Sequence, residues 1–212
     1  MIVAMLGEKG GTGKTTFATN LAGMRAAAGR DVLILDADRQ GSASYWAEKR
    51  EKHEVPSVTS VQKFGTGLMR VVSDMACRYG DIVIDIAAGD SREIDGALRA
   101  ARRVIIPVQP AGLDVWTLGI IDERVGEAKL VNAELEAFVV INRASTNPRD
   151  GDVDEARNAI SGCENFTVSD VVVRERVAIK RAAPNGFTVA EFQPLDPKAV
   201  TEFEALYRLT FG

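Results

Sequence analysis

The fold of this chain is decided by one stretch, Lys9-Gly10-Gly11-Thr12-Gly13-Lys14-Thr15-Thr16. It lies between a short apolar run, Met1–Leu6, and a segment with the composition of a helix, Lys14–Ala28. Glycines let backbone N–H groups turn inward around an anion, and the N-terminus of the following helix adds partial positive charge. The order of strand, glycine loop and helix therefore predicts a phosphate-binding loop.

Two side chains of this loop suit a bound polyphosphate. Lys14 can reach the terminal phosphates, and the hydroxyl of Thr15 can hold Mg²⁺. The other expected nucleotide contacts are Gly10, Gly11, Thr12, Gly13 and Thr16. The common form of the loop has glycine at the position of Glu8, and this chain also carries a second lysine, Lys9, early in the loop.

Short apolar runs alternate with helical segments along the rest of the chain. The runs are Val32–Leu35, Asp81–Ile86, Arg103–Val108 and Ala137–Ile141; the helical segments are Leu68–Tyr79, Ser91–Ala101, Val115–Val131 and Asp152–Ser161. This alternation predicts an α/β fold with a single doubly wound, mostly parallel sheet flanked by helices. Strands buried on both faces explain why the runs are apolar throughout. We expect one P-loop domain over residues 1–212, with the amphipathic segment Pro197–Phe211 packed on the sheet.

Composition narrows the class of protein. The 212 residues are 46% hydrophobic and 26% charged, with a net charge of −4. Nucleic-acid binding would therefore need a local basic patch. The two cysteines match no metal-ligand spacing, and the apolar start lacks the basic flank of a signal peptide. We expect a cytoplasmic protein that does not span a membrane.

Acidic residues follow the strands nearest to the loop. Asp36 and Asp38 come directly after the second apolar run, and Asp85 ends the third. Such acids at a strand end can be solvated or can cap the next helix. Their coincidence with a phosphate loop favours a role in binding Mg²⁺ and water instead.

The loop with its early lysine resembles the signature of ParA/MinD-type ATPases, which carry a deviant Walker A motif, and the likeness extends to about residue 191. It is strongest to small ParA proteins without an N-terminal operator-binding domain, because Met1 begins the first strand. The resemblance implies that Lys9 reaches across a dimer to the partner's nucleotide. It also implies that Asp36 supports the Mg²⁺ shell, that Asp38 orients or activates the attacking water, and that Asp85 is the second Walker acid. Arg39 stands where the family usually has proline.

The same resemblance extends to two further segments. Ile86–Asp90 would be the second switch, ordered by the γ-phosphate. Pro107–Pro110 and Ile141-Asn142-Arg143 resemble segments that contact the purine, so that Asn142 would pair with the adenine edge and Arg143 would stack on its face. Either residue could instead cap a loop.

A basic segment, Val173–Ala183, suggests what the nucleotide switch acts on. Taken as a helix, it would place Arg174 near Arg181 on one side and Arg176 near Lys180 on another. By resemblance, these four residues would bind non-specific DNA in the ATP state through phosphate contacts. The alternative is a solvated helix face.

The function implied by the resemblance is a weak ATPase that is stimulated by a partner, with ATP and Mg²⁺ as cofactors. It would dimerise with ATP and bind nucleoid DNA in a bacterium or archaeon. An adaptor such as a ParB-type centromere-binding protein would stimulate hydrolysis of the bound ATP. Plasmid or cellular cargo would thereby be partitioned or positioned. A MinD-like membrane-associated ATPase is the alternative, although Pro197–Phe211 lacks the basic face of a membrane-surface helix. An electron-transfer relative would need cysteine ligands, and a non-catalytic scaffold would not need the complete set of site residues.

Overall fold

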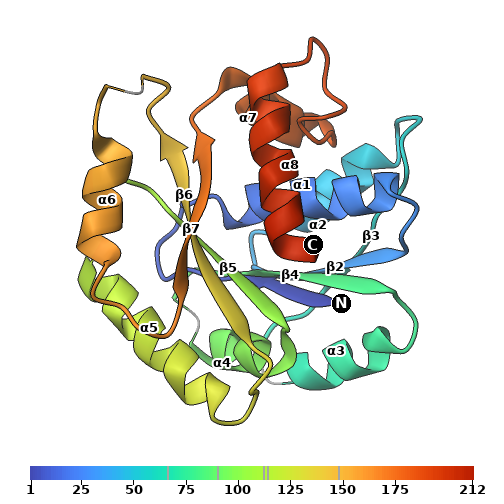
Figure 1. The fold of residues 1–212 in the computed structure, drawn as a ribbon. Helices are drawn as coiled ribbons and strands as arrows, with labels where there is room; N and C mark the ends of the chain where they lie inside the picture. Colours follow the sequence, from blue (N-terminus) through green and yellow to red (C-terminus); the bar gives the residue numbers. More distant parts are fainter. Residues whose placement is uncertain (66, 90, 112, 114, 148) are drawn as a thin grey trace.

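A single seven-stranded parallel sheet forms the centre of the molecule (Figure 1). The computed structural model describes residues 1–65, 67–89, 91–111, 113, 115–147 and 149–212. The strand order is β3-β2-β4-β1-β5-β6-β7, and every described pairing is parallel. The strands are β1 Ile2–Met5, β2 Val32–Ala37, β3 Thr59–Gln62, β4 Asp81–Ile86, β5 Arg103–Val108, β6 Glu136–Ala144 and β7 Thr167–Arg174.

Helices cover both faces of the sheet and enclose two apolar cores (Figure 1). One core is shared by α3 Leu68–Ala76, α4 Ser91–Ala100, α5 Val115–Lys129 and α6 Asp152–Ile160. The other lies beneath α1 Lys14–Ala27, α2 Ser42–Arg50, α7 Val177–Ala182 with the short 3₁₀ helix η1 Ala183–Asn185, and α8 Pro197–Phe211. The predicted doubly wound α/β fold is confirmed.

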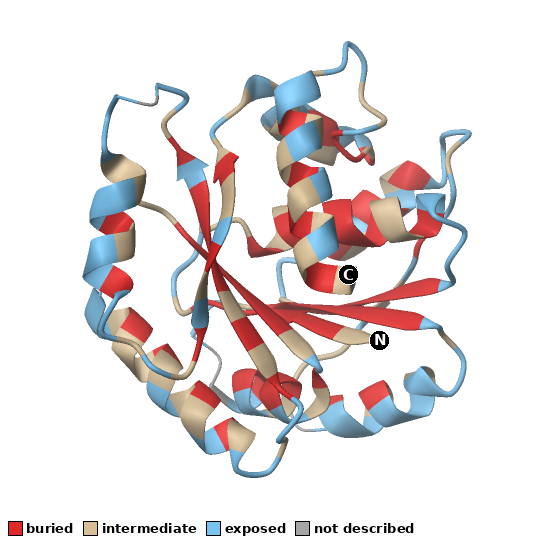
Figure 2. Cartoon of the chain, viewed as in Figure 1, coloured by how far each residue is buried: buried red, intermediate tan, exposed pale blue. Residues whose placement is uncertain are grey.

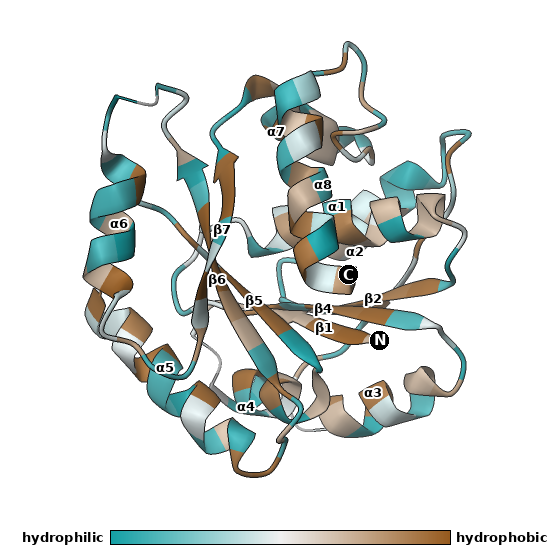
Figure 3. Ribbon diagram, in the orientation of Figure 1, coloured by the Kyte–Doolittle hydropathy of each residue, from teal (hydrophilic) through white to brown (hydrophobic). Residues whose placement is uncertain are grey.

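The central strands are apolar because helices cover both faces of the sheet. Every residue of β2 and β4 is buried, and Figures 2 and 3 show the strands as buried and hydrophobic while the outer helix faces are exposed and polar. The order of the sheet reverses at β1, which has β4 on one side and β5 on the other. In open α/β sheets, the crevice at such a reversal, outside the carboxyl ends of the strands, is where ligands bind.

The structure corrects the prediction for the basic segment. Val173 and Arg174 end strand β7, which pairs with β6, and helix α7 begins only at Val177. Val173 is fully buried against the sheet, and β-branched residues favour such a strand. Strand β7 and helix α2 were not among the predicted elements. Asp90, which ends the expected second switch, lies outside the described residues.

A buried ion pair ties α2 to the segment before α8. The side chain of Arg50 is 0% exposed and forms two hydrogen bonds of 2.7 Å with the carboxylate of Glu191. It also donates to the carbonyl of Pro56 at 2.6 Å and lies over the ring of Trp46. Burial raises the pKa of Glu191, but hydrogen bonds from Arg50 and Thr188 outweigh it and hold the pKa below its usual value. This pair fixes the Thr188–Glu191 region to the body of the protein.

We expect Arg50→Met to lower the free energy of unfolding by about 3–5 kcal/mol, because it leaves the Glu191 carboxylate buried without its cation. Arg208→Met is the matched control, since Arg208 is 67% exposed and pairs with Glu204 one turn away. That control should change the free energy of unfolding by less than about 0.5 kcal/mol. Urea unfolding of both variants measures this, and equal effects would contradict the prediction.

Candidate functional site

The glycine loop between β1 and α1 closes around its own lysine. Lys14 is 7% exposed, and its ammonium donates to the carbonyls of Gly7 at 3.2 Å and Lys9 at 3.0 Å. Gly11 and Gly13 have φ values of 79° and 107°, a region that favours glycine. The loop therefore curls so that the backbone before α1 surrounds a small space, as an anion-binding loop requires.

Charges near Lys14 come from three carboxylates. Burial lowers the pKa of Lys14, and the charges of Asp85, Asp38 and Glu8 oppose that shift. All three acids are thus close enough to act on the ammonium. Lys14 is the cation about which the acidic residues of this edge are arranged.

Side chains from two neighbouring strand ends brace the loop. The amide nitrogen of Asn142, in β6, donates to the carbonyl of Thr12 at 2.7 Å, and Gln109, just after β5, donates to the carbonyl of Gly11 at 2.7 Å. Both residues came from segments predicted to contact the purine. In this structure their amide nitrogens hold the loop, a role that the sequence pattern did not indicate.

The carboxylates at the ends of β2 and β4 lie in register. Asp36 and Asp85 are opposite each other in adjacent strands, and Met5, at the end of β1, is opposite Asp85 on its other side. Asp36 accepts hydrogen bonds from the backbone N–H groups of Asp38 at 3.1 Å and Ser44 at 2.8 Å. Both of its oxygens thus organise the turn into α2.

Asp85 differs from Asp36 because neither of its buried carboxylate oxygens has a hydrogen-bond partner among the described residues. Burial raises the pKa of Asp85 to about 7, while the hydroxyl of Thr15 and the ammonium of Lys14 oppose this shift. Buried carboxylate oxygens without donors are rare in proteins. A hydrated cation held by Asp85 and Thr15 would satisfy them, so these residues fit a Mg²⁺ ion.

A second part of the site lies beyond Thr16, where a pocket of ≈ 220 Å³ separates the start of α1 from the segment after β7. Asn142 and Arg143 line this pocket, and Arg143 has a φ of 53°, which is uncommon for a residue other than glycine. The pocket is also lined by Arg174, Glu175, Arg176, Ile179, Lys180, Ala183 and Pro184. It therefore adjoins the phosphate loop at Thr16.

Three of the four cations predicted to bind DNA therefore line this pocket, and each has an acceptor within the chain. Arg176 is 12% exposed and binds the carboxylate of Glu202 with a shortest distance of 2.6 Å. Arg174 donates to the carbonyl of Ser145 at 2.8 Å, and Lys180 pairs with Glu175 at 2.5 Å. Arg181 is exposed on α7. The prediction of one helix over Val173–Ala183, with Arg174 near Arg181 and Arg176 near Lys180, is wrong, because β7 continues to Arg174 and α7 begins at Val177.

Comparison with known proteins identifies the family. The family described as CobQ/CobB/MinD/ParA nucleotide binding domain matches residues 3–189. The chain belongs to this family. The match includes the glycine loop, the three acids Asp36, Asp38 and Asp85, and the segment that lines the pocket beyond Thr16. The resemblance to ParA/MinD-type ATPases that the sequence indicated is thus confirmed at the level of the family.

Similar members of the ParA/MinD family cover nearly the whole chain. "Maintenance of carboxysome distribution protein A" from Gloeobacter kilaueensis is 33% identical over 209 residues, 98% of this chain and 90% of that protein. The protein of the same name from Halothiobacillus neapolitanus is 27% identical and covers 96% of this chain and 93% of its own length.

Solved structures show the same fold. A variant of McdA from Cyanothece in complex with ATP has a TM-score of 0.75 at 15% identity, covering 98% of this chain and 95% of that one. The septum site-determining protein MinD from Pyrococcus horikoshii in complex with Mg-ADP has a TM-score of 0.73 at 21% identity, covering 98% and 94%. The chain thus has the P-loop fold of ParA and MinD proteins.

We expect Gly13→Ala to weaken ADP binding at least about tenfold, because a Cβ at this position would lie 2.1 Å from the amide nitrogen of Asn142 and push away the brace of the loop. Gly29→Ala is the matched control: Gly29 also has a positive φ, of 78°, but a Cβ there meets nothing within 4 Å. Titration with a fluorescent ADP analogue compares the two. A similar loss in both variants would show that backbone strain alone, and not the brace, is responsible.

Proposed function

We propose that this protein is an ATPase that uses ATP binding and hydrolysis as a switch for positioning intracellular cargo. The observation that carries the proposal is the arrangement around Lys14. A braced phosphate loop, the acid Asp38 and the buried carboxylate of Asp85, which accepts no hydrogen bond from the described residues, all act on one small space. This set of groups suits phosphoryl transfer to water, for which positioned charges supply most of the rate.

In this proposal, each residue of the loop has a defined task. The backbone N–H groups of Gly10 to Gly13 surround the phosphates, and the ammonium of Lys14 exchanges its contacts with Gly7 and Lys9 for the terminal phosphates. Thr15 and Asp85 would hold Mg²⁺, which would supply positive charge for the phosphates, while Asp36 keeps the turn before α2 in place. Asp38 orients the attacking water and accepts its proton.

The base would occupy the pocket beyond Thr16. Arg143 is exposed at the rim of this pocket, where its guanidinium can stack on a purine. The nitrogen of Asn142 already donates to Thr12, so its carbonyl oxygen is the atom left to accept from the exocyclic amine of adenine. This arrangement favours ATP, and it assigns Asn142 to both the loop and the base.

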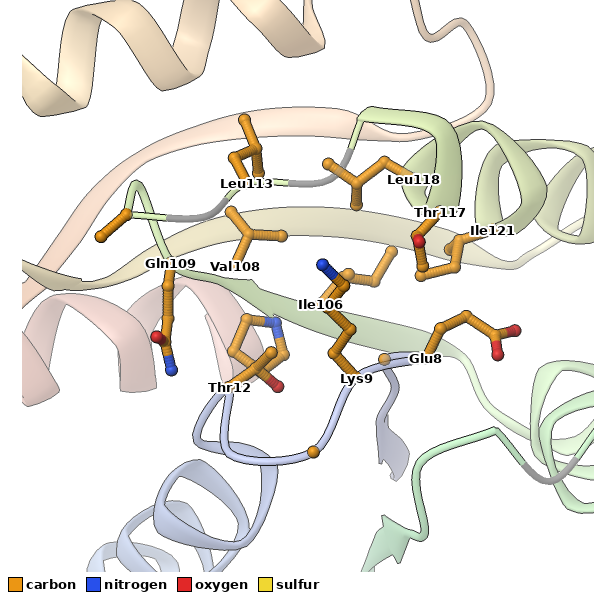
Figure 4. Close-up of a pocket in the computed structure, with 14 residues that line it drawn as sticks. Glu8, Lys9, Thr12, Ile106, Val108, Gln109, Leu113, Thr117, Leu118 and Ile121 are labelled. Atoms are coloured by element: carbon orange, nitrogen blue, oxygen red, sulfur yellow. The ribbon is translucent and has the colours of Figure 1, made fainter.

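Lys9 is the residue that would link hydrolysis to assembly. Its side chain extends from the loop into a second pocket of ≈ 100 Å³ beside α5, toward Val108 and Leu118 and away from the space enclosed by the loop (Figure 4). Lys9 is exposed, and its side chain points away from the space that its own phosphates would occupy. We propose that it neutralises phosphate charge in trans within an ATP-dependent homodimer.

Cargo positioning needs a surface along which the dimer can move, and we propose non-specific nucleoid DNA. Arg181 is exposed on α7, and Lys180 beside it is 62% exposed, so both can contact phosphates. Dimerisation doubles this patch and raises its effective affinity. An adaptor of the ParB type would stimulate hydrolysis. Because the two relatives that cover nearly the whole chain are named for carboxysome distribution, we favour a large protein assembly as the cargo over a plasmid.

The nucleotide switch can be tested with Lys14→Ala and Lys9→Ala, measuring ADP affinity, mass in solution with ATP and Mg²⁺, and phosphate release. Lys14→Ala should lose nucleotide binding by at least about a hundredfold, because it removes a charge-assisted contact in a buried site. Lys9→Ala should bind ADP like wild type but fail to form the dimer. If Lys9→Ala still dimerises and hydrolyses ATP normally, the role in trans is wrong.

The DNA interaction can be tested separately by binding to random-sequence duplex DNA with ATP, with ADP and without nucleotide. We expect salt-sensitive binding only with ATP, reduced roughly fivefold or more by Arg181→Ala in the dimer. Arg157→Ala serves as the control, because Arg157 lies on α6 and pairs with Asp170. An ATP dimer that ignores DNA would leave the ATPase proposal standing and would exclude DNA as the surface.

A further inference from the structure

Glu8 occupies the position at which the common form of the loop has glycine, and its side chain is largely enclosed. It is 18% exposed, and its Oε1 atom is buried without a hydrogen-bond partner among the described residues. A buried carboxylate oxygen without a donor is unfavourable and uncommon. Glycine would avoid this cost. The carboxylate next to Lys9 therefore needs a reason beyond the shape of the loop.

Arg124, on α5, is the cation that faces this carboxylate. Its Nε atom lies 3.9 Å from Oε1 of Glu8, and its Nη1 atom lies 3.4 Å from Oδ1 of Asp95, on α4. The distance to Glu8 is within the range of an ion pair but too long for a hydrogen bond. Arg124 thus lies between two carboxylates and connects the loop to helices α4 and α5.

The same part of the loop contacts the residues that precede α4. A Cβ at Gly89 would lie 4.0 Å from the carbonyl oxygen of Glu8, so the two backbones are close. Helix α4 begins directly after the segment 86–90, of which residues 86–89 are described. Asp95 lies on α4, so its contact with Arg124 and the approach of Gly89 to Glu8 join the same two parts of the chain.

Glu8 and Lys9 point in different directions from adjacent positions. In Figure 4, the side chain of Lys9 extends toward Val108 and Leu118, whereas the carboxylate of Glu8 points away from Lys9, on the side of the pocket where Ile121 lies. Because the two residues share a peptide bond, an anchor on the side chain of Glu8 limits the rotation of the backbone that carries Lys9. The charge of Glu8 also acts on Lys14, so the anchor lies at the edge of the phosphate space.

We propose that Glu8 and Arg124 are positioning residues that fix the direction in which Lys9 leaves the loop. The inference rests on the proposed function, in which Lys9 acts on the nucleotide of a second copy. The ion pair orients Lys9 for the dimer and contributes little to nucleotide binding within one chain. Asp95 holds the other side of the guanidinium, so that α4 contributes to the same alignment.

The test uses Glu8→Gln, Arg124→Gln and the conservative variant Arg124→Lys in the full chain. Each is measured for Mg-ADP affinity, for the dissociation constant of the ATP dimer and for kcat. Glu8→Gln and Arg124→Gln should weaken the dimer and lower kcat roughly tenfold, since small misplacements of a catalytic group cost at least this much. Their ADP affinity should stay within about twofold of wild type. Arg124→Lys keeps the charge and should retain most of the wild-type values.

A control variant separates positioning from other effects. Glu134→Gln removes another Arg–Glu ion pair, with Arg102, which lies at the amino ends of β5 and β6 and so at the other end of the strands from the site, and it should leave all three measurements unchanged.

The outcomes that overturn the inference are distinct. Glu8→Gln that dimerises and turns over like wild type shows that the pair has no effect on Lys9. If these variants lose ADP affinity as strongly as they lose dimer formation, the ion pair supports the fold of the loop, and the proposal that it positions Lys9 is wrong. Wild-type protein that stays monomeric with ATP would overturn the proposed function itself, and the inference would fall with it.

Discussion

The close approach of Asn142 to the turn at Gly13 is the constraint on which the rest of the site depends. Gly13 has a φ of 107°, which favours glycine, and a Cβ there would lie 2.1 Å from the amide nitrogen of Asn142, which donates to the carbonyl of Thr12. The brace comes from β6, while the loop belongs to β1, so the phosphate site exists only when the sheet is assembled. Binding of an anion and packing of the core are therefore coupled in one contact.

The sheet also determines how the acidic groups differ. Asp36 and Asp85 stand in register on neighbouring strands, yet Asp36 is satisfied by backbone N–H groups whereas the oxygens of Asp85 have no partner in the described part of the chain. Burial in this setting raises the pKa of Asp85 to about 7. A carboxyl group of this kind is suited to a cation brought in with the nucleotide, while Asp36 suits a structural role in the turn before α2.

The pocket beyond Thr16 is lined by three of the four basic residues that the sequence predicted to bind DNA. Arg174, Arg176 and Lys180 lie within one short segment of sequence, but in the structure each is held by a nearby acceptor around a cavity that adjoins the phosphate loop. Ion pairs within the chain reduce the charge available to an external polyanion. The residues that line this pocket and the exposed residues of α7 thus belong to one region of the molecule.

The sequence by itself determined the fold class and the family. A glycine loop between an apolar run and a helix, with acids after later runs, has few structural solutions, and the bounds predicted for Asp81–Ile86, Arg103–Val108 and Pro197–Phe211 agree with β4, β5 and α8. Tertiary structure alone decided which side chains meet. It decided that β7 ends at Arg174, that the amide of Asn142 braces the loop, and that Arg124 lies beside Glu8. The last two contacts join residues more than a hundred positions apart in the sequence. Local periodicity carries no information about such pairs, because they depend on strand order and on the packing of helices across the sheet.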